Sequence, residues 1–340
     1  MNIQSALAEL FEGHDLSQQD AREVFLEVMS GSTTPAQLGA LLAALRVKGE
    51  TPGEVAGAAE AMRALSTKVE VDLPYLVDTC GTGGSGAKLF NISTAAAFVT
   101  AATGAKVAKH GNRKMTSYSG SADVLEAAGV NIELAPEQIA HCIEDVGVGF
   151  LFAQAHHSAM RFAAPVRQEL GARTMMNVLG PMTNPAGARN QVVGVFSPDW
   201  QTTMAQVLKL LGADHVLVVH SGGLDEIALD APTRVVELKS GEISDYQIEP
   251  GHFDITATSH DGLRADSPES SLALMKQALT EPDSAAADIV SLNAGAAIYA
   301  AGVATSFKNG VIMAQDAIAA GLANERLAEL VRITRLMGES

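Results

Sequence analysis

The chain has 340 residues, of which 47% are apolar and 18% charged, and its net charge is −16. This length predicts one large domain and a smaller one, and the acidic balance argues against nonspecific nucleic-acid binding. Two cysteines, Cys80 and Cys142, are too few for a disulfide framework. No signal peptide and no apolar run of membrane-spanning length is visible, so we expect a cytoplasmic protein with no membrane or nucleic-acid partner.

Residues 1–66 show the pattern of helices alone. Three capping boxes are predicted, in which a hydroxyl caps free amides and a residue three positions on reaches back. They pair Ser17 with Asp20, Thr34 with Gln37 and Thr51 with Glu54. Leucines at 38, 41, 42 and 45 fall at helical spacing. The segment therefore predicts a small helical domain.

From about residue 71, short apolar stretches that end in polar or glycine-rich turns alternate with helical ones. Strands are predicted at 75–77, 105–108 and 215–220, a hairpin at 233–237 with 242–248, and helix again over 291–336. This alternation predicts an α/β domain over 67–340 with a largely parallel central sheet. Ligands bind such sheets at the carboxyl ends of the strands.

Residues 78–94, DTCGTGGSGAKLFNIST, place a glycine-rich loop at the first of these strand ends. The loop contains G-x-G-x-x-G, but a dinucleotide site needs an acidic residue about 20 positions on, and the next strand ends in Lys109-His110. A flexible turn would explain the glycines alone. It would not explain why residues 79–122 hold five basic residues and no acidic one, with polar donors after both strands. The pattern favours a phosphate site.

Three other features carry less specific information. Asp225-Glu226 follow the strand at 215–220 and a Gly-Gly turn, where adjacent carboxylates suit Mg²⁺. Without that context, a solvated turn would explain them. Arg167, taken alone, is most simply a surface charge. His156-His157 would point to different faces of a helix, which argues against a zinc site.

Several motifs in order resemble the anthranilate phosphoribosyltransferase family: GTGG, NIST, KHGNR and SGSADVLEAAGV. GVGFLFA (147–153), APVRQELG (164–171), NVLGPMTNPAG (177–187) and GLDE (223–226) continue the resemblance, which extends to LNAGAAIYAAG (292–302) and so covers nearly the whole chain. It implies a nucleoside phosphorylase/phosphoribosyltransferase-like fold. It also implies a homodimer formed through the helical domain. This domain comprises residues 1–66 together with part of the segment 155–185.

The resemblance implies transfer of the phosphoribosyl group of 5-phosphoribosyl 1-pyrophosphate (PRPP) to the amine of anthranilate. Pyrophosphate is released, and the reaction belongs to tryptophan biosynthesis with two Mg²⁺ per subunit. No protein nucleophile is required, because positioning and electrostatics can carry such a reaction.

The resemblance further assigns residues to each ligand. Mg²⁺ is expected at Ser93, Asp225 and Glu226, and anthranilate at Gly81, His110, Asn112 and Arg167. PRPP is expected at Gly81, Gly84, Ser85, Leu89, Asn91, Ile92, Ser93, Thr94, Lys109, His110, Gly111, Asn112, Arg113, Lys114, Met115, Thr116, Ser117 and Ser121.

The chain departs from the family pattern at Ser85, where Asp is usual, at Leu89, where a polar residue is common, and at Tyr118, where Lys is usual. We expect activity with altered affinity for PRPP or Mg²⁺. A pyrimidine nucleoside phosphorylase is one alternative, but it should not need the pair at 225–226. A non-catalytic nucleic-acid-binding relative is the other, and it should have lost the phosphate motifs and gained a basic surface. KHGN and GPMTNPAG favour the transferase.

Overall fold

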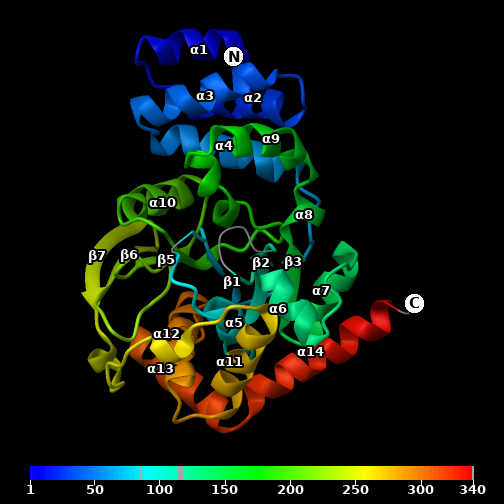
Figure 1. Cartoon of the computed structure of the whole chain (residues 1–340), viewed down its shortest axis with the longest axis vertical. Helices are drawn as coiled ribbons and strands as arrows, with labels where there is room; N and C mark the ends of the chain where they lie inside the picture. Colours follow the sequence, from blue (N-terminus) through cyan, green and yellow to red (C-terminus); the bar gives the residue numbers. More distant parts are fainter. Residues whose placement is uncertain (85, 114–117, 339–340) are drawn as a thin grey trace.

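The computed structural model describes residues 1–84, 86–113 and 118–338. An N-terminal bundle contains α1 (Ile3–Phe11), α2 (Gln18–Met29), α3 (Pro35–Lys48) and α4 (Pro52–Leu65), and it lies at the top of Figure 1. The predicted capping boxes at Thr34 and Thr51 are complete. At α2 the Ser17 hydroxyl accepts from the Asp20 amide and donates to the Asp20 carboxylate. The helical domain is confirmed, with a different cap on α2.

A seven-stranded sheet forms the centre of the larger part, in the order β3-β2-β1-β4-β5-β6-β7. The first five strands are parallel, and β6 and β7 form an antiparallel hairpin at one edge. The predicted α/β class is confirmed. The strands are β1 (Leu76–Gly81), β2 (Lys106–Gly111), β3 (Val148–Phe152), β4 (Asn190–Gly194), β5 (His215–His220), β6 (Thr233–Lys239) and β7 (Glu242–Ile248).

Two of these strands differ from the sequence-based prediction in a way that affects the site. β1 continues into the glycine loop as far as Gly81, and β2 continues through Lys109 and His110 to Gly111. Lys109 and His110 therefore belong to the strand and do not follow it. β3 and β4 are strands that the sequence pattern did not single out.

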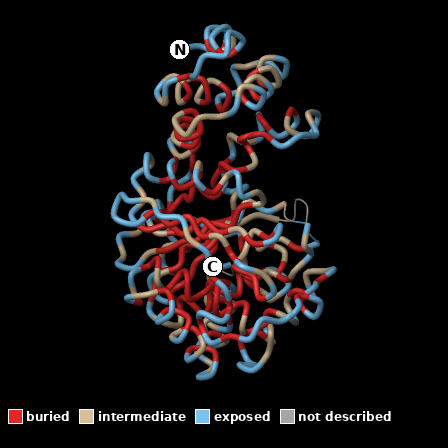
Figure 2. Tube along the Cα trace, turned by 90° about the vertical axis from the view of Figure 1, so that its left-hand side faces the viewer, coloured by how far each residue is buried: buried red, intermediate tan, exposed pale blue. Residues whose placement is uncertain are grey.

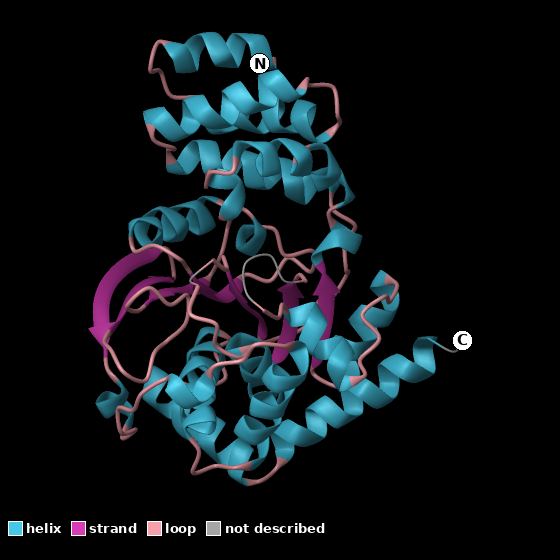
Figure 3. Cartoon of the chain, viewed as in Figure 1, coloured by secondary structure: helices cyan, strands magenta, loops and turns pink. Residues whose placement is uncertain are grey.

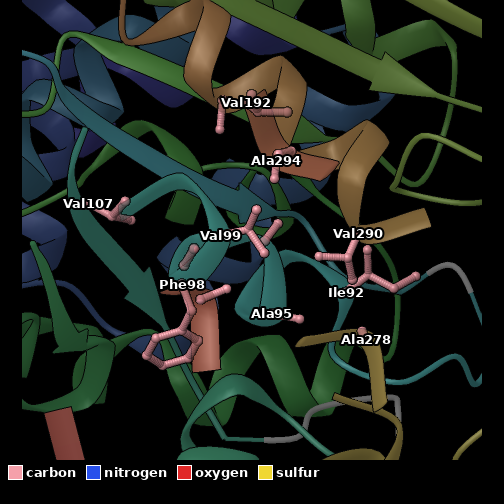
Figure 4. Close-up of a cluster of buried hydrophobic side chains, with 14 of the residues drawn as sticks. Ile92, Ala95, Phe98, Val99, Val107, Val192, Ala278, Val290 and Ala294 are labelled. Atoms are coloured by element: carbon pink, nitrogen blue, oxygen red, sulfur yellow. The ribbon is translucent and has the colours of Figure 1, made fainter. Parts of the chain in front are cut away.

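Helices cover both faces of the sheet, as Figure 3 shows. The helix α5 (Ile92–Ala102) is rich in alanine and packs closely against β1, β2 and α12. Figure 4 shows Phe98 and Val99 of α5 in a buried cluster with Val107 of β2 and Val192 of β4. The other helices are α6 (Ser121–Ala128), α7 (Pro136–Asp145), α8 (Ala153–His156), α9 (Ala164–Leu170), α10 (Asp199–Leu210), α11 (Pro268–Thr280), α12 (Ala285–Ala300), α13 (Phe307–Ala319) and α14 (Leu322–Gly338).

A second hydrophobic core runs from the bundle through α4 and α10 to the opposite face of the sheet. Figure 2 shows buried residues both in the bundle and in the larger part below it. The helix α9, which follows β3 and α8 in the chain, packs against α3 of the bundle. The link between the bundle and β1 is fastened to α8, because the Thr67 amide donates to the His156 carbonyl at 2.9 Å. Within the described residues, no helix is both long and apolar enough to cross a membrane.

Candidate active site

Asp225 lies across the carboxyl ends of two neighbouring strands, where Gly81 of β1 pairs with Gly194 of β4. A Cβ on Gly81 would lie 2.9 Å from the Asp225 carboxylate, and one on Gly194 would lie 1.7 Å from the Asp225 carbonyl oxygen. Glycine at both positions therefore allows the acidic turn to lie directly on the edge of the sheet. Asp225 Oδ2 accepts a hydrogen bond from the Gly83 amide at 2.9 Å. The structure thus brings the glycine loop and the first predicted metal ligand together.

Glu226 and Ser93, the other two predicted metal ligands, line one small cavity of about 10 Å³ together with Thr79 and Asn293. Burial and the neighbouring Asp225 raise the pKa of Glu226 to about 8. Two adjacent carboxylates beside a hydroxyl are a donor set that Mg²⁺ accepts, and the cation would relieve the repulsion between them. In the described ranges no cluster of three or more His, Cys, Asp or Glu side chains is suited to a metal. Mg²⁺ is commonly held by one or two carboxylates, with phosphate oxygens and waters completing its coordination, and the pair Asp225-Glu226 fits this pattern.

Lys109 is a buried cation at the same place, with 2% of its surface exposed. Its ammonium donates to the Thr79 carbonyl at 2.5 Å and to Ser93 Oγ at 3.3 Å, and burial lowers its pKa. The predicted phosphate cation therefore points into the protein, where it fixes the hydroxyl of a predicted metal ligand. Its position inside β2, which the sequence pattern missed, explains this direction.

The predicted phosphate ligands after the glycine loop lie at the start of α5, which begins at Ile92. Asn91 Nδ2 donates to the Ser119 carbonyl at 3.2 Å, and its Oδ1 accepts from Ser271 Oγ at 2.7 Å. Thr94 is buried, and its hydroxyl has no hydrogen-bond partner among the described residues. Ile92 is 1% exposed and its side chain packs in the core. Any contact of this residue with a ligand is therefore made by its backbone, at the start of α5.

The second predicted loop is only partly described. Asn112 Oδ1 accepts from the Arg113 amide at 2.8 Å and from Gln154 Nε2 at 3.3 Å. The Arg113 guanidinium binds the Glu126 carboxylate, with Nη2–Oε1 at 2.8 Å, so the structure does not bring this predicted ligand to the phosphate site. Gly111 lies against Ser121, whose Cβ would be 2.9 Å from a side chain at 111. Ser85, Lys114, Met115, Thr116 and Ser117, which the resemblance assigns to PRPP, lie outside the described residues.

His110, one of the predicted anthranilate residues, belongs to a group of buried histidines. The rings of His110 and His157 are 5.1 Å apart, and the Nε2 atoms of His110, His156 and His157 have no partner among the described residues. Burial lowers the pKa of all three, that of His157 to about 4. Arg167 lies on α9, half-buried, and makes no ion pair in the part of the chain that the structure describes. Leu89 joins the site through its backbone, in a bridge to Arg264.

Several residues that hold these loops were not predicted from the sequence. Asp78 is fully buried and accepts from the His110 amide at 3.1 Å and from Asn184 Nδ2 at 2.7 Å. Its place as the only acid in an apolar strand that leads into the glycine loop could have singled it out. Arg173 donates to the Gly84 carbonyl at 2.8 Å and lies 4.2 Å from the Phe196 ring centroid. No sequence signal identified Arg173.

A glycine-rich loop, a buried lysine and a carboxylate pair lie together at one edge of the α/β sheet, and the class of protein that combines these features with a helical bundle is the glycosyl transferase. The model of the glycosyl transferase family matches this chain in both parts: its helical bundle domain over residues 4–66 and its a/b domain over residues 73–324.

Comparison of the whole chain with known proteins points to one enzyme family within this class. The anthranilate phosphoribosyltransferase of Teredinibacter turnerae is 55% identical over 99% of this chain and all of its own, and that of Hahella chejuensis is 54% identical over the full chain and 99% of its own. A crystal structure of the Thermus thermophilus enzyme superposes with a TM-score of 0.93 at 44% identity, covering 97% of this chain and 99% of that one. The Saccharomyces cerevisiae enzyme in complex with PRPP and Mg gives 0.88 at 25% identity, covering 98% of each chain. This chain belongs to the anthranilate phosphoribosyltransferase family.

Proposed function

We propose that this chain transfers the phosphoribosyl group of PRPP to the amine of anthranilate, with release of pyrophosphate, in tryptophan biosynthesis. The observation that carries the proposal is the placement of Asp225 and Glu226 against the glycine loop and Ser93. A pyrimidine phosphorylase would have no use for such a carboxylate pair. The full-length similarity to enzymes of this name supports the same substrates.

In this proposal PRPP occupies the carboxyl edge of β1 and β2. Amides of the glycine loop and the start of α5, near Asn91 and Thr94, bind its phosphates. Asp225, Glu226 and Ser93 would hold Mg²⁺, which neutralises charge on the leaving pyrophosphate. We propose two ions per subunit, because PRPP carries phosphate groups at two separate positions and two adjacent carboxylates, Asp225 and Glu226, are available at this edge.

Lys109 has a structural part in this arrangement. Its ammonium joins the Thr79 carbonyl in β1 to Ser93 in α5, so the strand end and the helix start keep a fixed separation. Such preorganised dipoles need not rearrange as charge develops on the leaving group.

Arg167 is proposed to bind the anthranilate carboxylate, because a guanidinium can grip a carboxylate with two hydrogen bonds. Asn112, Gly81 and His110 are proposed to line the aromatic ring. The aniline nitrogen carries an uncharged lone pair at neutral pH, so no protein base needs to activate it. The lowered pKa of His110 keeps its imidazole neutral beside the aromatic ring of the ligand.

We also propose that the chain forms a homodimer through the bundle, residues 1–66 with part of 155–185, and that it works in the cytoplasm. The bundle exposes large apolar side chains on two of its helices: Phe11 at the end of α1 is 67% exposed and Val47 near the end of α3 is 89% exposed. Such residues favour an interface. Sedimentation at several concentrations, with Val47→Glu alongside, tests the dimer.

The test of the activity is loss of anthranilate fluorescence on mixing protein, PRPP and Mg²⁺. Asp225→Asn should strongly reduce the activity and raise the Mg²⁺ concentration it needs, and Arg167→Ala should raise the KM for anthranilate more than the KM for PRPP. A flat trace with folded protein would contradict the proposal and would direct attention to phosphorolysis of nucleosides.

A further inference from the structure

Lys88 and Tyr118 form a contact between the two loops that hold the predicted phosphate ligands. Lys88 lies at the end of the glycine loop, and Tyr118 leads into α6. Lys88 Nζ donates to the Tyr118 hydroxyl at 3.2 Å and lies 4.9 Å from the centroid of its ring. Both side chains are exposed, Tyr118 by 44%. The ammonium is therefore held on an aromatic platform that solvent, and a ligand, can reach.

This contact adjoins a second one between the same loops. Asn91, three residues after Lys88, donates to the carbonyl of Ser119, the residue after Tyr118. The backbone of Lys88 is also constrained: its φ is +57°, uncommon outside glycine, and its carbonyl accepts from the Ala265 amide at 2.9 Å. Hydrogen bonds thus hold the chain on both sides of the Lys88–Tyr118 contact.

The neighbouring basic residues already form hydrogen bonds or ion pairs with other groups of the protein. Lys106 Nζ donates to the Glu144 carbonyl, Lys109 is buried against Thr79, and Arg113 binds Glu126. Across 79–84, 86–113 and 118–122, Lys88 is the basic residue whose charged group is exposed and has neither a carboxylate nor a carbonyl partner. Because Lys109 points into the protein, Lys88 is the residue within these ranges that can add positive charge for a diphosphate here, beside the proposed Mg²⁺.

We propose that Lys88, seated on Tyr118, is a further substrate-binding residue, whose ammonium binds the diphosphate of the phosphoribosyl substrate at the seam between the two loops. The proposal rests on the proposed function. Tyr118 acts through Lys88 as a positioning residue: its ring stabilises the cation, and its hydroxyl orients the ammonium.

The experiment measures the KM for PRPP, the KM for anthranilate and kcat, together with the Kd of Mg-pyrophosphate by calorimetry. Lys88→Met should raise the KM for PRPP and the Kd for pyrophosphate by about tenfold, with little change in the KM for anthranilate, since one charge-assisted hydrogen bond is lost. Tyr118→Phe keeps the ring and loses the hydroxyl, so a change of about twofold is expected. Lys276→Met, at an exposed lysine on α11, is the matched control and should change nothing.

Charge-restoring variants separate a binding cation from a merely structural side chain. Lys88→Arg should keep most of the PRPP affinity, and Tyr118→Lys in the Lys88→Met background should recover part of it by returning an ammonium to the same seam. Unchanged PRPP and pyrophosphate constants in Lys88→Met would overturn the proposal, as would equal losses for both substrates or failure of both charge-restoring variants. Absence of turnover in the unmodified protein would instead refute the proposed function, whereas pyrophosphate binding would still report on Lys88.

Discussion

In the N-terminal bundle, a fully buried carboxylate has all the partners it needs. Glu54 accepts from the Leu16 amide at 2.9 Å, from the Thr51 amide at 2.8 Å and from Lys48 Nζ at 3.1 Å. At the carboxyl edge of the sheet, Glu226 shares a small cavity with Ser93 and lies next to a second carboxylate, and its pKa rises to about 8. Thr94, at the same edge, has a buried hydroxyl with no partner among the described residues.

The difference separates polar groups that stabilise the fold from polar groups that are kept ready for ligands. Buried groups that are satisfied within the chain add stability and specificity, whereas unsatisfied ones cost free energy until something binds. The bundle should therefore respond to mutation through stability, and the sheet edge through ligand binding. Each prediction below tests one side of this contrast, starting from the largest effect.

Asp225→Asn should lower kcat/KM by about 10²–10³-fold, because the site loses the Asp225 carboxylate charge at the place where Mg²⁺ would neutralise the leaving group. The amide oxygen can still accept from the Gly83 amide, so the thermal midpoint without ligands should stay close to that of the original protein. Steady-state kinetics across a Mg²⁺ titration and a melting curve check both parts. Asp316→Asn, at an exposed carboxylate on α13, is the control. Equal losses in both variants would contradict the assignment.

Asp78→Ala tests a buried, hydrogen-bonded carboxylate that lies beside the proposed ligand site. Removing this buried carboxylate leaves the His110 amide and Asn184 Nδ2 without their shared acceptor, and we expect the free energy of unfolding to fall by about 3–5 kcal/mol. Urea denaturation measures the loss. Asp78→Asn keeps the shape and one acceptor oxygen, so it should lose less. If both variants unfold like the original protein, the network does not hold the two strand ends together.

The contrast also explains what could be predicted from the sequence. Caps such as Thr34 with Gln37 lie three residues apart, so local spacing is enough to find them. The sequence also predicts that the glycine loop and Asp225-Glu226 share one edge, because strand ends in a parallel sheet meet there. Lys109 was placed after a strand that in fact continues to Gly111, and so its inward direction was missed. Contacts such as Asp78–Asn184 join residues about a hundred positions apart, and no local pattern contains them.

Acid should weaken the fold through the buried histidines near the site. The pKa of His157 is lowered from 6.5 to about 4 by burial. Between those two values the unfolded chain binds the proton and the folded chain does not, so stability rises with pH through this window and is complete above about 6.5. For His157 the full difference is about 3 kcal/mol. Unfolding free energies at pH 7, 6, 5 and 4.5 should therefore fall more steeply than in His157→Gln. Parallel curves for the two proteins would contradict this, and His14→Gln, an exposed histidine on the bundle side, should follow the original protein.

Thr51→Ala should have the smallest effect and should be seen in stability alone. The Thr51 hydroxyl accepts from the Glu54 amide at 3.2 Å, and its loss costs about 1 kcal/mol at the start of α4. Glu54 keeps its bonds to Leu16 and Lys48, so the bundle should stay folded. Thr34→Ala removes the equivalent cap from α3 and should cost a similar amount. The KM for PRPP should be unchanged in both variants, because each hydroxyl caps a backbone amide of its own helix and contacts no part of the proposed site that the structure describes. A shift in that KM would mean that the bundle and the sheet edge are coupled through α4 and α10, and the separation between stabilising and ligand-binding polar groups would then fail.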